Sequence, residues 1–431
     1  MKLKTSILFL FFILFCLSCK KDKDVTAPTI TISSPSESQQ YNALDTVKVT
    51  ITVEDETALK QIDITLTDYN KIPVLATKTI VPQDKKVTLT ILYPLNDINL
   101  LSGTYYIWVK ASDGINDQNT YRSINISAVP QVLKYIYIFS FGNSTTVHLL
   151  RQTPSGNPQH LFDINGDFSS SAASSKSQLI YSCGKTFGNL HAYNIADNLE
   201  SWTIPVSSNP PFPYFDYIGC YNNILYVSFY DGYIRGYYNN GSPTITAITP
   251  SKAHPMKLCA GSNYLYADHE NYSGTSRTFG VYYLTSGMLK QQITTDFQAV
   301  EIFEKDDDNV FIFANQSGQG IMELYSISGN GVWAPHTIPT GKINDVLQID
   351  ENNYIIAHQS GMYKYQYDNN SLTSYVLGIN ATSIKYNPTT SEIFASSGSE
   401  IMVYDYASHS LINTISVADS IMDFQLLYNR Q

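Results

Sequence analysis

Histidines and acidic residues are the side chains best suited to acid–base or metal chemistry. In this sequence their spacing matches no common motif for either. The eight histidines are scattered along the 431 residues, with no HExxH motif, no paired CxxC motif and no close zinc-type spacing. The densest cluster is Asp268-His269-Glu270. We expect it in a loop between two strands. A metal or sugar site there is one interpretation, and a solvated loop is the favoured one.

Nucleophilic catalysis has no recognisable motif either. The chain lacks GxSxG, and its serines are so frequent that a Ser–His–Asp grouping chosen by eye carries no information. Residues 239–242 and 328–331 look like turns rather than phosphate cradles, because no helix is expected after them. The sequence therefore favours a protein that is not an enzyme, although an active site assembled from distant loops stays open.

Aromatic residues near a proline-rich segment are the better indication of a binding site. Residues 207–217 are stiffened by prolines and offer Phe212, Tyr214, Phe215 and Tyr217 close together. Two interpretations remain: the rings wedge between neighbouring structural repeats, which is favoured, or they form a binding lip. Rigid rings supply contact area at low entropic cost and suit both sugars and protein partners.

The three cysteines beyond the N-terminal region are Cys183, Cys220 and Cys259. An odd count without paired spacing does not indicate a disulfide framework. Each cysteine lies within an apolar, strand-like run, so we expect small buried core residues.

The N-terminus has the features of a secretory signal. Two lysines precede an apolar run over residues 7–17, which is shorter than the roughly 20 residues of a transmembrane helix. Cys16-Leu17-Ser18-Cys19 resembles the lipobox of bacterial lipoproteins, with Cys16 where leucine is usual. An ordinary signal peptide cut nearby, with Cys19 lost or free, is the alternative.

The lipoprotein resemblance implies a location. Residues 1–18 would be the signal peptide, Cys19 would carry lipid, and residues 19–27 would form a tether. The protein would then be a membrane-anchored lipoprotein of the cell envelope. The charged run over residues 20–24 resembles tags that direct some lipoproteins to the outer surface, so we expect the outer membrane and a surface-exposed chain.

Composition favours an all-β extracellular protein. Aromatic residues reach 13%, with 33 tyrosines, while charged residues make up only 15%. Such a composition suits strands better than helices. The net charge of −10 argues against nucleic acid as a partner, because nucleic-acid binding needs basic patches.

Residues 28–128 alternate apolar and polar positions in about seven short strands, the size of an immunoglobulin-like β-sandwich. The opening run over residues 27–35 and the run Val109-Lys110-Ala111-Ser112-Asp113-Gly114 resemble bacterial Ig-like or cadherin-like modules. We expect Trp108 in the core of the penultimate strand. The resemblance to cadherin-like modules implies a weak calcium site, and no other cofactor is predicted. Its ligands would be Asp55, Glu56, Asp113 and Asp117.

Residues 131–431 repeat at about 40 to 46 residues, the period of propeller blades. Each unit pairs a buried strand with a second strand that ends in aromatics, and seven such units can be counted. The segment Ile421–Leu427 has no unit of its own, so we expect it to complete the first one. The repeat resembles the seven-bladed β-propellers of the YVTN/quinoprotein-like and WD40-like superfamilies, without the Gly-His and Trp-Asp signatures or a Trp-docking motif.

The sequence thus predicts an all-β chain in which an immunoglobulin-like β-sandwich is followed by a seven-bladed β-propeller. We expect a lipid-anchored envelope protein with a non-catalytic role, whose propeller recognises a protein or a glycan. A carbohydrate-active enzyme, either a lyase or a hydrolase, with its active site at the propeller mouth is one alternative. A scaffold of an envelope complex is the other.

Overall fold

The computed structural model describes residues 25–206 and 214–429. These residues form strands and turns, so the all-β prediction is confirmed. No helix among them is long and apolar enough to cross a bilayer. The chain divides into two compact units, Met1–Pro130 and Gln131–Gln431.

The first unit is a sandwich of two sheets that share one core. A three-stranded sheet has the order β1-β3-β6, and a five-stranded sheet has the order β2-β8-β7-β4-β5. In β3, Val47, Val49, Ile51 and Val53 are fully buried while the residues between them face outward, as period-2 alternation requires. The strands are β1 (Thr29–Ser34), β2 (Gln39–Asn42), β3 (Thr46–Glu54), β4 (Gln61–Thr67), β5 (Lys78–Ile80), β6 (Lys86–Pro94), β7 (Gly103–Ser112) and β8 (Asp117–Ser127).

Trp108 lies on the outer face of β7, so the prediction that it is a core residue is wrong. Its neighbours Ile107 and Val109 are fully buried, and alternation therefore turns the indole the other way. There it stacks on Tyr121, with ring centroids 6.5 Å apart, and its Nε1 donates to Asn119.

The described residues of the second unit form seven antiparallel sheets of four strands each. In six of them the four strands follow one another along the chain. The seventh has the order β11-β10-β9-β36, so the C-terminal strand pairs with the first strand of the unit. The strands of the first three sheets are β9 (Leu133–Asn143), β10 (Thr146–Gln152), β11 (Gln159–Asn165) and β36 (Ile421–Tyr428); β12 (Ser170–Ser174), β13 (Leu179–Cys183), β14 (Leu190–Asn194) and β15 (Glu200–Ile204); β16 (Phe215–Tyr221), β17 (Ile224–Phe229), β18 (Tyr233–Tyr237) and β19 (Pro243–Ile248).

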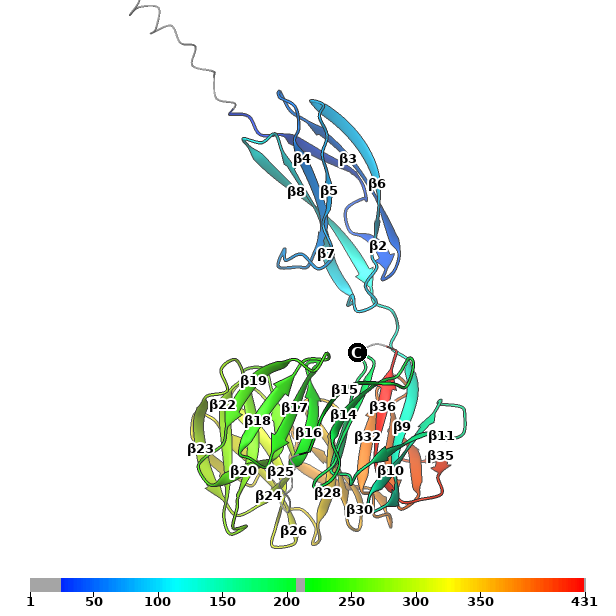
Figure 1. The fold of residues 1–431 in the computed structure, drawn as a ribbon, viewed down its shortest axis with the longest axis vertical. Helices are drawn as coiled ribbons and strands as arrows, with labels where there is room; N and C mark the ends of the chain where they lie inside the picture. The colour runs from blue at the N-terminus through cyan, green and yellow to red at the C-terminus, as the bar shows by residue number, and fades with distance from the viewer. Residues whose placement is uncertain (1–24, 207–213, 430–431) are drawn as a thin grey trace, which may run out of the picture. The chain divides into compact units, whose positions relative to one another are not determined.

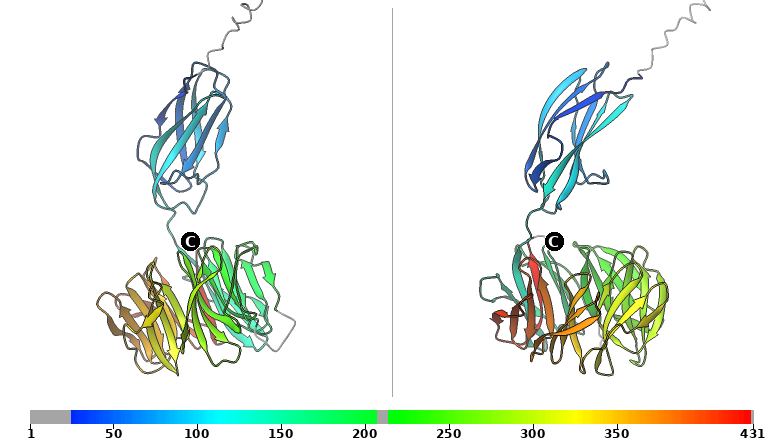
Figure 2. Two further views of the ribbon diagram at one scale, coloured as in Figure 1. Left: turned by 90° about the vertical axis from the view of Figure 1, so that its left-hand side faces the viewer. Right: turned by 180° about the vertical axis from the view of Figure 1, so that it is seen from behind.

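The first strand of each sheet, with β36 taking that place in the closing sheet, contacts its counterpart in the next sheet. These inner strands form a closed ring through β12, β16, β20, β24, β28, β32 and β36. Figure 1 shows the sheets of this unit side by side, and Figure 2 shows them from two other sides. Sheets arranged in this way make the unit a β-propeller, as predicted. The remaining strands are β20 (Ala253–Ala260), β21 (Tyr264–Asn271), β22 (Arg277–Tyr283) and β23 (Leu289–Thr295); β24 (Gln298–Glu304), β25 (Asn309–Gln316), β26 (Gln319–Ser326) and β27 (Gly331–Trp333); β28 (Ile343–Gln348), β29 (Asn353–His358), β30 (Gly361–Gln366) and β31 (Ser371–Leu377); β32 (Ser383–Asn387), β33 (Glu392–Ser397), β34 (Glu400–Asp405) and β35 (Leu411–Ser416).

Aromatic rings fill the spaces between neighbouring sheets, which explains the high tyrosine content. Phe311 is fully buried, and the centroid of its ring lies 5.1 Å from that of Tyr354 and 6.1 Å from that of Tyr365. The Tyr365 hydroxyl donates to the side chain of Asn370, a turn residue with a φ of 46° that asparagine tolerates better than most residues. Tyrosine thus supplies core packing and anchors a turn with its polar end.

The carboxylate of Asp167 holds the turn that follows β13. It accepts hydrogen bonds from four consecutive backbone N–H groups, those of residues 185–188, at 2.8 to 3.0 Å. Burial alone would raise the pKa of Asp167, but these four donors outweigh it and hold the pKa below its usual value.

Asp167→Ala is expected to lower the free energy of unfolding by about 2 to 3 kcal/mol, because it leaves several turn amides without a partner. The matched control is Asp197→Ala, where one turn amide is lost, and a smaller decrease is expected. Urea denaturation measures both. The Asp167 contribution should be present above about pH 4 and disappear as the pH falls below that, because the unfolded carboxyl takes up its proton first. Equal losses in the two variants would contradict this account.

Candidate functional site

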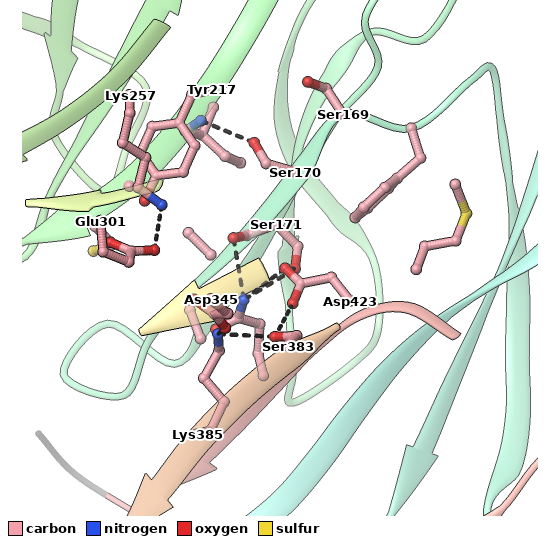
Figure 3. Close-up of a pocket in the computed structure, with 18 of the residues that line it drawn as sticks. Ser169, Ser170, Ser171, Tyr217, Lys257, Glu301, Asp345, Ser383, Lys385 and Asp423 are labelled. Carbon is pink, nitrogen blue, oxygen red and sulfur yellow. Dashed lines mark hydrogen bonds and ion pairs between the residues drawn. The ribbon is translucent and has the colours of Figure 1, made fainter. Parts of the chain in front are cut away.

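The inner strands of the propeller surround a cavity of about 350 Å³. Figure 3 shows its wall, which is rich in hydroxyl groups and ionised side chains from separate sheets. Each inner strand contributes to it, so residues far apart in the sequence meet there. The charged side chains are Lys257, Glu301, Asp345, Lys385 and Asp423.

Lys257 on β20 and Glu301 on β24 form an ion pair across neighbouring sheets. The two side chains are only 15% and 18% exposed, and the Lys257 ammonium also lies 4.2 Å from the centroid of the Tyr217 ring on β16. Burial would lower the pKa of Lys257, but Glu301, Tyr217 and Asp345 together outweigh burial, so the pKa is raised and the ammonium stays protonated. Burial raises the pKa of Glu301 to about 7, against the opposing effect of Lys257.

A second ion pair lies further round the ring. Lys385 Nζ on β32 is 3.7 Å from Asp345 Oδ2 on β28, and it donates to the Ser383 hydroxyl at 3.2 Å. Asp345 Oδ2 also accepts the backbone N–H of Ile384 at 2.8 Å, which ties β28 to β32. Burial would lower the pKa of Lys385, but Asp345, Asp423 and Glu301 together outweigh it, so the pKa is raised.

Asp423 on β36 links the inner strands on either side of it, β12 and β32. Its carboxylate accepts the hydroxyl of Ser171 on β12 at 2.7 Å and that of Ser383 on β32 at 3.1 Å. The Gln425 amide donates to it at 3.1 Å. With these contacts the cavity wall carries both donors and acceptors, and its positive charges are paired with carboxylates.

Tyr217 is the predicted aromatic residue that the structure places at this cavity. Phe215 is fully buried, and the half-buried Tyr214 packs edge-to-face on Phe215 and Phe229 with ring centroids 4.7 and 5.4 Å away. The packing interpretation therefore describes Tyr214 and Phe215. Phe212 and the expected lipidation residue Cys19 lie outside the described residues.

The cluster Asp268-His269-Glu270 belongs to strand β21, so its assignment to a loop is wrong. Asp268 and His269 are fully buried. Arg277 on β22 contacts the carboxylates of Asp268 and Glu270 at 2.9 and 2.6 Å, and Asp268 accepts the backbone N–H of Ala299 on β24 at 3.1 Å. The cluster fastens one sheet to the next.

The four calcium candidates do not gather into a site. Asp55 accepts from Thr57 at 2.7 Å, Asp113 accepts from the backbone of Asn116 at 2.7 Å, and Asp117 pairs with Lys110 at 2.8 Å. Glu56 is exposed. Short-range turn and strand contacts thus use these carboxylates, and the metal-type grouping that the described residues form lies elsewhere.

Two of the three cysteines, Cys183 and Cys259, are buried as expected, and Cys220 is half-buried in the cavity wall. Sequence reasoning missed the charged cavity residues. The repeat period could have identified them. Lys257, Glu301 and Asp345 are separated from one another by about one repeat, and they occupy successive inner strands.

Comparison with known proteins gives no family. No family model matches the chain, and no curated protein matches it. Similar solved structures include the computationally designed Ika8 protein, at 13% identity and a TM-score of 0.45, over 68% of this chain and 90% of that one. A chain of the mitotic checkpoint complex has 11% identity and a TM-score of 0.46, over 59% and 80%. The Dos1 propeller has 11% identity and a TM-score of 0.45, over 59% and 74%.

With TM-scores below 0.5, these similarities carry no argument about function. The class of the protein follows from its own geometry. It is an all-β chain whose second unit is a β-propeller with a polar cavity inside its ring of inner strands.

Proposed function

We propose that this chain is a lipid-anchored binding protein of the cell envelope whose propeller recognises a glycan at the inner-strand cavity. In this proposal Cys19 carries the anchor, the first unit is an immunoglobulin-like stalk and the second is a seven-bladed propeller. Outer-membrane, surface-exposed placement is part of the proposal. The observation that carries the binding role is the paired-charge, hydroxyl-lined cavity.

The chemistry of that cavity suits a neutral, polyhydroxylated ligand. Sugar hydroxyls both donate and accept hydrogen bonds, and the wall offers both kinds of group side by side in Ser171, Ser383 and Asp423. Lys257 and Lys385 each have a carboxylate beside them, which leaves no unpaired positive charge at the cavity to attract an anionic ligand. A volume of about 350 Å³ lies within the range of small-molecule sites.

Glu301 favours a second candidate, a carbohydrate-active enzyme. A buried carboxyl whose pKa is raised to about 7 is suited to donate a proton at neutral pH. Incubation of the protein with polysaccharides, followed by analysis of released sugars, tests this candidate. If sugars are released and Glu301→Gln abolishes that release, the role of the cavity is catalysis rather than binding.

A panel of oligosaccharides tests the binding proposal by thermal unfolding and then by calorimetric titration. A ligand at 100 times its dissociation constant adds about 2.7 kcal/mol to the stability of the native state. Lys257→Gln is expected to lower the affinity for the sugar at least tenfold, because a hydrogen bond from a charged donor contributes about 1.5 to 3 kcal/mol.

The matched control is Lys290→Gln, a lysine on the outer strand β23 that lies near the rings of Tyr264 and Tyr283. It should leave sugar affinity unchanged. If the two variants bind equally well, the cavity is not the site. If no sugar in the panel binds, the glycan proposal fails, and a protein partner becomes the candidate to be sought by cross-linking on intact cells.

A further inference from the structure

Two histidines and an aspartate converge on the outer strands of the closing sheet, away from the residues that line the cavity. His148 lies on β10, and His160 and Asp163 lie on β11. One ligand atom from each lies within 4.8 Å of the others. This is the one metal-type grouping of three such residues within the described part of the chain.

A β-bulge brings these three side chains to one face. Asp163 pairs with His148 across the ladder, whereas His160 pairs with Leu150 because the register shifts at this point. In a regular strand residues 160 and 163 would point to opposite faces, since side chains alternate. The extra residue in β11 reverses that alternation and places His160 beside Asp163.

The contacts among the three residues have the form of a ligand set. His148 Nδ1 and His160 Nε2 lie 2.6 and 2.7 Å from the same oxygen, Asp163 Oδ1. The two imidazole rings are 5.6 Å apart and inclined at 74°. The ligand atoms of a tetrahedral zinc ion lie about 3.4 Å apart. Moving the ligand atoms apart by less than about 1 Å would therefore make room for an ion. All three side chains are 30 to 53% exposed, which allows that movement.

Surrounding residues support His148 as a ligand. Its second nitrogen, Nε2, faces Asp419 Oδ2 at 3.9 Å. Metal-bound histidines commonly hold their other N–H toward a carboxylate, which fixes the ring. Gly142 on the neighbouring strand β9 leaves room for this ring, since a Cβ there would lie 2.9 Å from Nε2.

The donor set selects the class of ion. Calcium and magnesium prefer sites made of oxygen, whereas imidazole nitrogen suits zinc, copper and nickel. Two neutral histidines and one carboxylate carry a single negative charge, which attracts a cation. Three protein ligands at the surface also leave a coordination position open to water or to a group from outside.

We propose that His148, His160 and Asp163 bind a divalent transition-metal ion, with Zn²⁺ as the probe ion. The site is independent of the cavity and of its glycan role. Asp419 acts as a positioning residue for His148. The open position would give the propeller a second point of contact, through the metal, with a ligand that carries a nitrogen or oxygen donor.

Calorimetric titration of Zn²⁺ into the full chain, in detergent with its thiols kept reduced, tests the proposal. We expect one ion per chain. His160→Ala and Asp163→Asn should weaken binding at least tenfold, and Asp419→Asn should weaken it about tenfold, as for other groups that orient metal-bound histidines.

The matched control is His336→Ala, a histidine whose Nδ1 lies 2.8 Å from the Thr337 backbone oxygen. It should bind Zn²⁺ like the unaltered chain. Cu²⁺ electron paramagnetic resonance gives an independent readout, with two coupled nitrogens expected in the unaltered chain and one in His160→Ala. Absence of saturable Zn²⁺ binding, or equal affinity in the His160→Ala and His336→Ala variants, overturns the proposal.

Discussion

Asp268→Ala is expected to lower the free energy of unfolding of the propeller by about 3 kcal/mol. Asp268 is fully buried, and its carboxylate accepts from Arg277 on its own sheet and from the Ala299 backbone on the next. Removing it leaves a guanidinium that is only 15% exposed with Glu270 as its remaining carboxylate, and it leaves a buried amide without a partner. Breaking a buried, hydrogen-bonded ion pair from one side costs several kcal/mol.

The matched control for this variant is Asp231→Ala. Asp231 also pairs with an arginine, Arg235, at 2.8 Å, but the two side chains are 38% and 26% exposed. Exposed pairs of this kind contribute about 1 kcal/mol or less. Urea unfolding, followed by Trp202 and Trp333 in a Trp108→Phe background, measures both variants. If Asp268→Ala kept full stability and instead lost binding of a metal or sugar, the cluster would be a ligand site after all.

His269 is expected to make the propeller sensitive to acid. Burial lowers the pKa of this fully enclosed histidine to about 3, and its Nε2 accepts the Tyr282 hydroxyl at 2.9 Å. An unfolded histidine takes up a proton near pH 6.5. Between about pH 6.5 and 3 the unfolded state therefore binds more protons at this position, so its contribution to stability falls as the pH falls, by about 1.4 kcal/mol per unit.

Neighbouring titratable groups also make the free energy of unfolding depend on pH. Burial raises the pKa of Asp268 to about 7, against the effect of Arg277, and a raised carboxyl gains stability as the pH falls toward 4. The His254 charge adds to the lowering at His269. The His269 contribution must therefore be measured as a difference between variants.

Comparison of the unaltered chain with His269→Gln isolates that contribution. The difference in their free energies of unfolding should change by about 2 kcal/mol between pH 7 and pH 5. Tyr282→Phe is the control, because it removes the hydroxyl but keeps the buried imidazole and hence the acid slope. If His269→Gln leaves the pH dependence of the free energy of unfolding unaltered, His269 is protonated to the same extent in the folded and unfolded states.

The fold could be predicted much further than the site. Strand alternation and a repeat of about 40 residues are carried by many positions, so errors at single residues do not hide the all-β class or the propeller. The prediction that Trp108 is a core residue rests on its aromatic character alone. Its neighbours Ile107 and Val109 occupy the core face, so Trp108 lies on the other face.

Polar residues inside strands were harder to place. Asp268 and Glu270 looked like loop residues, since nothing local shows that Arg277 will neutralise them across the sheet. The metal grouping depends on a bulge in β11 that sequence spacing does not reveal. The cavity needs one residue from each of several sheets, so its composition emerges only when the ring is assembled.

The pairing of β36 with β9 also governs the order in which this protein can be completed in a cell. β9 leaves the ribosome before the rest of the propeller, whereas its partner β36 follows the other strands of this unit. Until then one side of β9 is an open edge, the kind of surface that recruits other chains. A premature stop codon or a proteolytic cut ahead of β36 would leave that edge exposed.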